Sequence, residues 1–232
     1  MSPLLVHAVA RGEPAARRTE GVGVRSGALR WVRGGEVGAW ATAWEGARPE
    51  LAREELFAHH RLVEELGTCL PVRFGTWVTD EAALAGLLRE REGELLGALR
   101  RVEGRRELAV TALWRGPAAP EPSSAGVGAG PGRRFLEERR TTWRARARRE
   151  ARARELAARL TDALALPGEA VQHRLCPSAA VALSSAFLVP ADRAAALRDR
   201  LVGVGEGFPE VRLLVHGPWP PYSFVGTVGG ER

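Results

Sequence analysis

Few residues of this chain are of a kind that could carry out covalent chemistry. The sequence has no Lys, so it offers no amine for a Schiff base, and its glycine-rich run 126–130 lacks the Lys of a phosphate-binding loop. No Ser lies in a Gly-x-Ser-x-Gly context. Most carboxylates are Glu residues beside Arg in helix-like stretches, where solvated ion pairs are the usual outcome. The sequence therefore predicts a protein that is not an enzyme and binds no cofactor.

Histidine and cysteine do not form a metal-binding pattern. His59 and His60 are adjacent, so in a helix they point in different directions and cannot act as an i, i+4 pair of ligands. His59 falls on an apolar helix face, which favours a hydrogen-bonded core histidine over a metal ligand. Cys69 and Cys176 are too far apart for a zinc signature, and their apolar contexts favour reduced thiols over a disulfide. We expect no bound metal.

Positive charge is concentrated in one segment. The formal net charge of the chain is +6, whereas residues 133–159 alone hold eleven Arg against four Glu, a net charge of +7. A solvated helix face is the simplest interpretation, and docking to an acidic protein or to nucleic acid phosphates are the alternatives. The residues that we expect to dock an acidic partner are Arg140, Arg144, Arg148 and Arg152.

The C-terminal run 217–225 reads Gly-Pro-Trp-Pro-Pro-Tyr-Ser-Phe-Val and follows an apolar strand-like segment. Because proline has no backbone donor and a fixed φ, we predict that sheet pairing ends before these prolines and that the run is extended and rigid. Its aromatic residues Trp219, Tyr222 and Phe224 would then pack through their side chains alone. Either the tail fastens itself to its own domain, or it presents a preformed recognition surface.

The elements that position these residues fall into two halves, and residues 1–104 read as an α+β domain. Stretches rich in Val, Leu and Trp predict strands at 4–10, 28–33, 37–44 and 69–78, with a hairpin turn at 33–36. Helical periodicity begins at Glu50 and ends at Gly67, and a second helix begins at its capping residue Asp80. The residues expected on the apolar face of the first helix are Leu56, His59, Leu62, Val63 and Leu66.

Residues 105–232 predict a second domain with the order strand, helix, strand, strand, helix, strand. The expected ranges are 107–114, 133–166, 171–176, 180–189, 191–204 and 211–216. This βαββαβ order is ferredoxin-like, with both helices on one face of an antiparallel sheet. Residues 116–132 are rich in Pro, Gly, Ser and Ala, so we expect a mobile loop there. The predicted fold class is therefore α+β with two domains, and the tail 217–225 belongs to the second.

The sequence also predicts where the protein resides. It contains no run of 18 or more apolar residues, so we expect no membrane span. Its first residues, MSPLLVHAVARGEP, form too short an apolar stretch for a secretory signal and soon become charged. We expect a cytoplasmic protein.

Several motifs together resemble a known family. They run from His59 and Val63 through LPVRFGT (residues 70–76), the stretch 80–108 and SAFLV (185–189) to GPWPPYSFV (217–225). In these positions the chain resembles the gas vesicle protein family GvpL/GvpF, and the last motif is the most specific. Phe187 stands where members commonly carry a tyrosine, so we expect this position to serve packing. The resemblance implies a non-enzymatic accessory protein of gas vesicle formation that is associated with the vesicle.

The partners that the resemblance implies are the small, hydrophobic major shell protein and, after it, other gas vesicle accessory proteins. We expect an exposed apolar or strand-edge surface to shield or position shell subunits before they polymerise. Aromatic residues and Arg dominate binding hot spots, and the candidates of this kind are Arg73, Phe74, Trp219, Tyr222 and Phe224. The same residues could instead join the two halves of the chain.

The alternative function is that of a basic ferredoxin-like module that binds nucleic acid or another polyanion. Nucleic acid is the less favoured partner, because the predicted strands carry no paired aromatic residues on which bases could stack.

Overall fold

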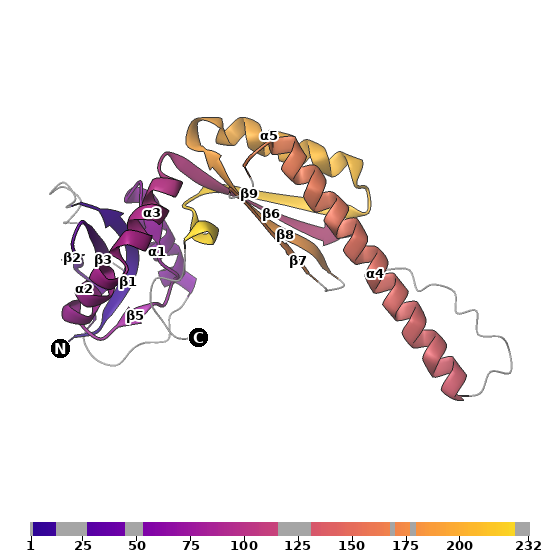
Figure 1. Ribbon diagram of the computed structural model, residues 1–232, viewed down its shortest axis with the longest axis horizontal. Coiled ribbons are helices and arrows are strands. Elements are labelled where there is room, and N and C mark those ends of the chain that lie inside the picture. Colours follow the sequence, from indigo (N-terminus) through magenta and orange to yellow (C-terminus); the bar gives the residue numbers. More distant parts are fainter. Residues whose placement is uncertain are drawn as a thin grey trace. The chain divides into compact units, whose positions relative to one another are not determined.

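The computed structural model describes residues 2–12, 27–44, 53–115, 131–167, 170–176 and 180–225 (Figure 1). These residues form a mixed α/β fold with two sheets. The chain divides into two compact units, which are Met1–Glu107 with Trp219–Arg232, and Leu108–Pro218. The first break lies close to the boundary expected near Gly104. The tail differs from expectation, because from Trp219 onward it belongs to the first unit.

The sheet of the first unit is built around its N-terminal strand. Its strands are β1 (Leu4–Arg11), β2 (Leu29–Arg33), β3 (Val37–Ala43), β4 (Leu70–Pro71) and β5 (Trp77–Val78). Their order is β2-β3-β1-β4, and β5 also pairs with β1. β2 and β3 form the predicted hairpin, whose turn contains Gly35 at a φ of 103°, in the left-handed region that favours glycine. The sequence pattern therefore predicted this hairpin correctly.

Three helices accompany this sheet: α1 (Arg53–Glu65), α2 (Glu81–Glu90) and α3 (Glu92–Val102). Asp80 caps α2 as predicted, since its Oδ1 accepts a hydrogen bond from the N–H of Ala83 at 2.8 Å. The periodicity from Asp80 onward does not form one continuous helix, because Arg91 leaves helical geometry at ψ 13° and separates α2 from α3. The predicted strand 69–78 is likewise interrupted, by a turn in which the backbone carbonyl of Arg73 accepts from the Thr76 N–H and hydroxyl.

The apolar face of α1 is as predicted at His59, Leu62, Val63 and Leu66, but not at Leu56. The helix buries Glu55, His59, Leu62 and Val63, whereas Leu56 is 45% exposed. Successive helical residues are about 100° apart, so a stripe that includes Glu55 and His59 leaves Leu56 beside the core rather than in it. Leu56 is therefore a surface residue and not a core residue.

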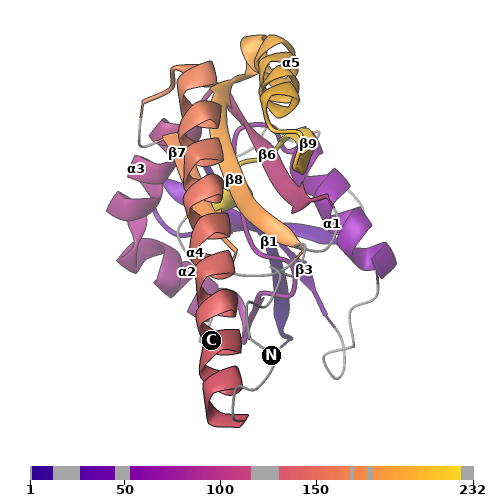
Figure 2. The same cartoon turned by 90° about the vertical axis from the view of Figure 1, so that its right-hand side faces the viewer.

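The second unit is built from β6 (Arg105–Trp114), α4 (Pro131–Leu164), β7 (Val171–Leu175), β8 (Val181–Pro190), α5 (Ala194–Val204) and β9 (Val211–Trp219). Its sheet has the order β7-β8-β6-β9, and β7 pairs with β8 in antiparallel register. α4 and α5 lie side by side over this sheet (Figure 2). The structure contains every strand and helix predicted for this half, with shifted ends.

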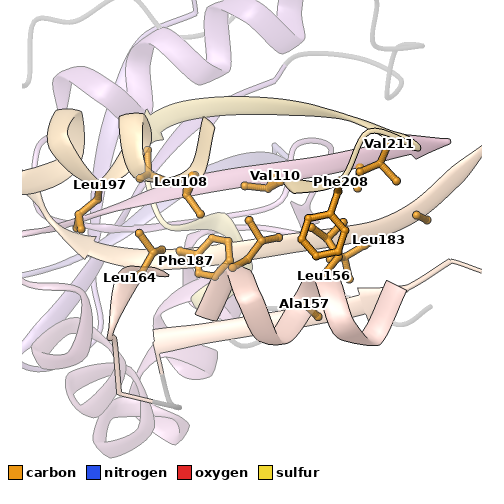
Figure 3. Packing of buried hydrophobic residues seen from close by; sticks show 14 of the residues in the cluster. Leu108, Val110, Leu156, Ala157, Leu164, Leu183, Phe187, Leu197, Phe208 and Val211 are labelled. Carbon is orange, nitrogen blue, oxygen red and sulfur yellow. The ribbon is translucent and has the colours of Figure 1, made fainter. Parts of the chain in front are cut away.

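The core of the second unit lies between its sheet and the two helices. Buried side chains from β6, β8, α4 and α5 converge there, as Figure 3 shows for Leu108, Leu183, Leu156 and Leu197. Phe187 is fully buried in this core, which confirms that its position serves packing.

Among the described side chains of α4, only those in its C-terminal part contribute to that core. Its buried residues are Ala153, Leu156, Ala157, Leu160 and Leu164. No side chain described between 136 and 152 is buried, and Figure 1 shows this part of the helix extending beyond the end of its sheet. We call residues 131–149 the projecting half of α4; it is about 28 Å long. Of the predicted loop 116–132, residues 116–130 lie outside the described residues, and the last two form the first turn of α4, where proline is well tolerated.

β9 continues through the first proline of the tail. The strand extends to Trp219, so the prediction that sheet pairing ends before Pro218 is wrong. β9 is the last strand in its sheet order and pairs with β6 alone among the described strands. A proline is tolerated on such an edge strand, because its missing N–H can face away from the sheet. Within the described ranges, no helix has both the length and the apolar character needed to cross a membrane.

Candidate functional site

The C-terminal tail is fastened to the first unit by hydrogen bonds. Past two buried prolines the chain forms a short 3-10 turn, Tyr222–Phe224. The carboxylate of Glu107 accepts from both the N–H and the hydroxyl of Ser223, at 2.7 and 2.8 Å. Burial raises the pKa of Glu107, and the two bonds from Ser223 oppose that effect. The backbone carbonyl of Phe224 accepts from the Arg101 guanidinium at 3.4 Å, and the Phe224 ring is buried.

The tail packs beside a buried pair of histidines. The Nδ1 atoms of His7 in β1 and His59 in α1 are 3.0 Å apart. His59 Nε2 lies 3.1 Å from the carbonyl of Val72, which can only accept, so this nitrogen carries a proton. The neutral His59 then accepts at Nδ1 from His7, whose Nε2 in turn accepts from the Thr42 hydroxyl at 2.8 Å. His59 is therefore the hydrogen-bonded core histidine that its place on the helix predicted.

Burial keeps both histidines neutral. It lowers the pKa of His7 to about 3 and that of His59 to about 4. For His7, repulsion from a protonated His59 acts in the same direction, whereas the bond to the Val72 carbonyl partly opposes the shift at His59. This pair supports the fold around the tail. Among the described residues, no group of three or more His, Cys, Asp or Glu is placed to hold a metal ion.

Aromatic rings from two separate segments, the turn after β4 and the tail, meet at the two histidines of α1. The ring centroid of His59 is 5.3 Å from that of Phe74 and 6.5 Å from that of Tyr222. The ring of His60 is 6.0 Å from Tyr222 and 5.8 Å from Trp219. The structure thus gathers Phe74 and the tail residues Trp219 and Tyr222, which lie far from Phe74 in the sequence, around one helix.

These aromatic side chains differ in their exposure to solvent. The Tyr222 hydroxyl is buried without a hydrogen-bond partner among the described residues, and burial raises its pKa. Phe224 is buried too, so its ring anchors the tail. Trp219 is 38% exposed. Arg73 is exposed on its turn, and its described bonds are those of its backbone carbonyl to Thr76.

Two further apolar side chains extend the exposed part of this cluster. Leu56 and Phe57 of α1 are 45% and 52% exposed. They precede His60 by four and three residues, a spacing that places all three on one side of the helix, and His60 contacts Trp219. We call Leu56, Phe57, His60 and Trp219 the α1–tail surface. Phe57 was not among the predicted surface residues, and Leu56 was expected in the core.

The Arg residues of α4 fall into two environments. Arg140, Arg144 and Arg148 are exposed on the projecting half. Arg152 is half-buried and forms ion pairs with Glu155, at 2.5 Å, and with Glu210. Its guanidinium also lies 4.5 Å from the centroid of the Phe208 ring. Of the four Arg predicted to dock an acidic partner, Arg152 therefore has its charge matched within the chain.

The fold and the exposed side chains define the class of this protein. It is a mixed α/β protein of two units, and its described surface carries exposed aromatic side chains on one unit and a basic helix on the other. A profile of the family described as gas vesicle synthesis protein GvpL/GvpF matches residues 3–226. The chain belongs to this family and takes part in gas vesicle formation, as the resemblance of its motifs predicted.

Individual relatives agree with this assignment. Gas vesicle protein F of Streptomyces sp. (strain CB03234) is 30% identical over 209 residues, which cover 84% of this chain and 86% of that protein. Gas vesicle protein L of the same organism is 32% identical over 183 residues, covering 73% and 68%.

Two crystal structures share the fold. GvpF from Anabaena sp. PCC7120 matches with a TM-score of 0.78 at 17% identity, covering 97% of this chain and 98% of that one. GvpF from Microcystis aeruginosa matches with a TM-score of 0.73 at 15% identity, covering 97% and 99%.

Proposed function

We propose that this protein is a non-enzymatic accessory factor of gas vesicle formation that binds the major shell protein in the cytoplasm during assembly. The observation that carries the proposal is the α1–tail surface, in which Leu56 and Phe57 are exposed on the side of α1 that carries His60, and the exposed Trp219 contacts His60. Clustered exposed apolar side chains are typical of protein interaction sites. The binding of a hydrophobic shell subunit at this surface would shield it until it joins the growing vesicle.

The surface is held by rigid elements, which favours binding. Trp219 ends strand β9 and is followed by two buried prolines, and the turn after them is fixed by the bonds between Ser223 and Glu107. Leu56 and Phe57 lie on a helix anchored by the buried His59. Side chains held in place in this way lose little conformational entropy on binding. Trp is also among the residues that most often dominate binding energy.

We further infer that the second unit is a ferredoxin-like domain that supports this function. Two observations support the inference. Its elements follow the order βαββαβ. In the sheet order β7-β8-β6-β9, each strand-helix-strand unit is split by one inserted strand: β8 lies between β6 and β7, and β6 lies between β8 and β9.

A pull-down from cells that co-express the tagged protein and the major shell protein tests the proposal. The samples are treated with nuclease and washed at low and at about physiological salt, roughly 0.15 M. We expect the shell protein to be retained at both salt concentrations, because apolar contacts are insensitive to screening. Recovery of nucleic acid without shell protein would refute the proposal and favour the polyanion-binding alternative.

Matched variants locate the binding surface in the same assay. Phe57→Ser with Trp219→Ala removes the two largest exposed rings of the α1–tail surface. The control is Val202→Ser on α5, because Val202 is 54% exposed and lies in the second unit. We expect the double variant to lose the shell protein and the control to retain it, while circular dichroism shows that both are folded. Equal retention by the two variants would exclude this surface.

A further inference from the structure

The projecting half of α4 is a long helical segment whose described side chains are not buried by its own unit. None of its described side chains is buried, whereas residues 153–164 hold every buried side chain described in this helix. Residues 139–149 hold six Arg and no acidic residue. Arg140, Arg144 and Arg148 follow one another at i, i+4 spacing, at which like charges destabilise a helix. Helices of this length are marginal without tertiary support, so such a segment gains stability from a partner.

One side of the projecting half also carries exposed apolar side chains at heptad spacing. Leu136 is 62% exposed, and Trp143, seven residues later, is 75% exposed. With these two at the d positions of a heptad, Arg140 and Ala147 occupy the a positions on the same side. The flanking e and g positions then include Arg144 on one edge and Arg139 and Arg146 on the other. In a coiled coil, charges at e and g select the partner by ion pairing across the interface.

We propose that the projecting half of α4 docks an acidic amphipathic helix of another protein. Leu136 and Trp143 would pack against the apolar seam of that helix, and the flanking Arg residues would pair with Glu or Asp on its edges. A second copy of this chain is a poor occupant, because two basic projecting halves repel each other. Nucleic acid phosphates would engage the Arg residues but would give the exposed leucine no partner. The site ends before Arg152, whose charge is matched by Glu155 and Glu210.

This inference is independent of the proposed function. The α1–tail surface lies in the first unit and is apolar, whereas the projecting half of α4 lies in the second and is basic. Either surface can fail its test without affecting the other.

The test measures binding of labelled synthetic peptides to the full-length protein by fluorescence anisotropy. The probe is a peptide of about four heptads with Leu at a and d and Glu at e and g. A peptide with Lys in place of each Glu is its charge control, and a short mixed-sequence DNA duplex is the competitor. We expect the Glu peptide to bind, the Lys peptide to show no binding, and the duplex to leave the Glu peptide bound.

Variants separate the two parts of the surface. Arg140→Glu with Arg144→Glu reverses two charges, and Trp143→Ala removes the exposed ring; each is expected to weaken binding of the Glu peptide at least about tenfold. The matched control is Arg198→Glu with Arg200→Glu on the exposed side of α5, which changes the net charge equally and is expected to bind within about twofold of the unmodified protein.

Several results would overturn the inference. One is the absence of binding to the Glu peptide. Another is equal loss of binding in the α5 control, which would show attraction by net charge alone. Unchanged binding by Trp143→Ala would show that no apolar contact with a partner helix forms there. Displacement of the peptide by the duplex would assign the site to nucleic acid.

Discussion

The buried histidine pair of the first unit shows how single side chains set the stability of the region around the tail. His7 and His59 form one chain of hydrogen bonds from the Thr42 hydroxyl to the Val72 carbonyl, and this chain requires both rings to be neutral. Protonation of His59 would place two N–H donors face to face across 3.0 Å, and protonation of His7 would remove the acceptor that its Nε2 offers to the Thr42 hydroxyl. A buried charge would also lack solvation.

The pH dependence of stability follows from the lowered pKa values. The folded-state pKa values of about 3 and about 4 lie below the ordinary 6.5, so the unfolded chain binds more protons between these values. The contribution of the pair is complete above about pH 6.5 and is lost as the pH falls toward 3. Each group contributes about 1.4 kcal/mol per pH unit within its window, so urea titrations should show a steep loss of stability from pH 6.5 to 4.

His59→Gln provides the check on that prediction, since the amide can hydrogen-bond but does not titrate. We expect this variant to be less stable at pH 7 and to show a shallower pH dependence than the unmodified protein. An unchanged slope in the variant would mean that other groups cause the acid sensitivity.

Tyr222 is predicted to stabilise the protein through its ring and not through its hydroxyl. The hydroxyl is buried without a partner among the described residues, which costs about 1 to 3 kcal/mol. Tyr222→Phe should therefore leave the free energy of unfolding unchanged or raise it by about 1 kcal/mol. Tyr222→Ala should lower it by about 2 kcal/mol or more, because the residue packs against the buried cluster that includes Leu62 and Val63. Thermal unfolding of both variants distinguishes the roles, and a large loss for Tyr222→Phe would contradict this account.

Single residues with a local signal were the most predictable from the sequence. The Asp80 cap, the turn at Gly35, the end of α1 near Gly67 and the buried His59 each follow from a residue type and its immediate neighbours. The partners of His59 could not be predicted, because His7 and Val72 reach it only through the tertiary fold. Leu56 was misassigned for a related reason, since the sequence does not show how far the core extends around α1.

Helix α4 illustrates the difference between forming an element and packing it. Arg-rich and Ala-rich sequence favours helix along its 34 residues, but of its described side chains only those from Ala153 onward are buried in a core. The composition therefore predicted the helix well and could not predict that its first half projects from the sheet.

Proline substitutions in the two parts of α4 test this division. Ala147 and Ala158 are both exposed, but Ala147 lies in the projecting half and Ala158 lies where the helix packs on its sheet. Ala158→Pro should cost about 3 kcal/mol or more, because it breaks a helix that supports the core. Ala147→Pro should change the melting temperature little. Similar melting temperatures for the two variants would show that the whole helix contributes equally to folding.

Strand β9 shows that the effect of a proline on strand pairing depends on where the strand lies in its sheet. Proline normally ends pairing, yet β9 includes Pro218 because it is an edge strand. The split of residues 69–78 into β4 and β5 and the break at Arg91 likewise depend on neighbouring elements. Apolar periodicity alone therefore predicted the existence of these elements better than their ends.

Over the complete chain, the order of helices and strands could be predicted from the sequence, but the unit in which the tail packs could not. The sequence assigned residues 217–225 to the C-terminal half, whereas from Trp219 the chain packs in the first unit, through Tyr222, Phe224 and Ser223. These contacts join residues more than a hundred positions apart, such as Glu107 and Ser223, which no local pattern reveals. As a consequence, the tail contributes to the α1–tail surface that we propose as the binding site.

Site-specific photo-crosslinking in cells that produce both proteins would test whether this surface meets the shell protein. A benzophenone analogue of phenylalanine replaces Phe57 on the α1–tail surface or, as the matched control, Val202 on α5, which has nearly the same exposure. We predict that irradiation links the shell protein to the analogue at position 57 and not to the analogue at position 202. Crosslinks to the shell protein from position 202 alone, or from neither position, would contradict the proposed binding surface.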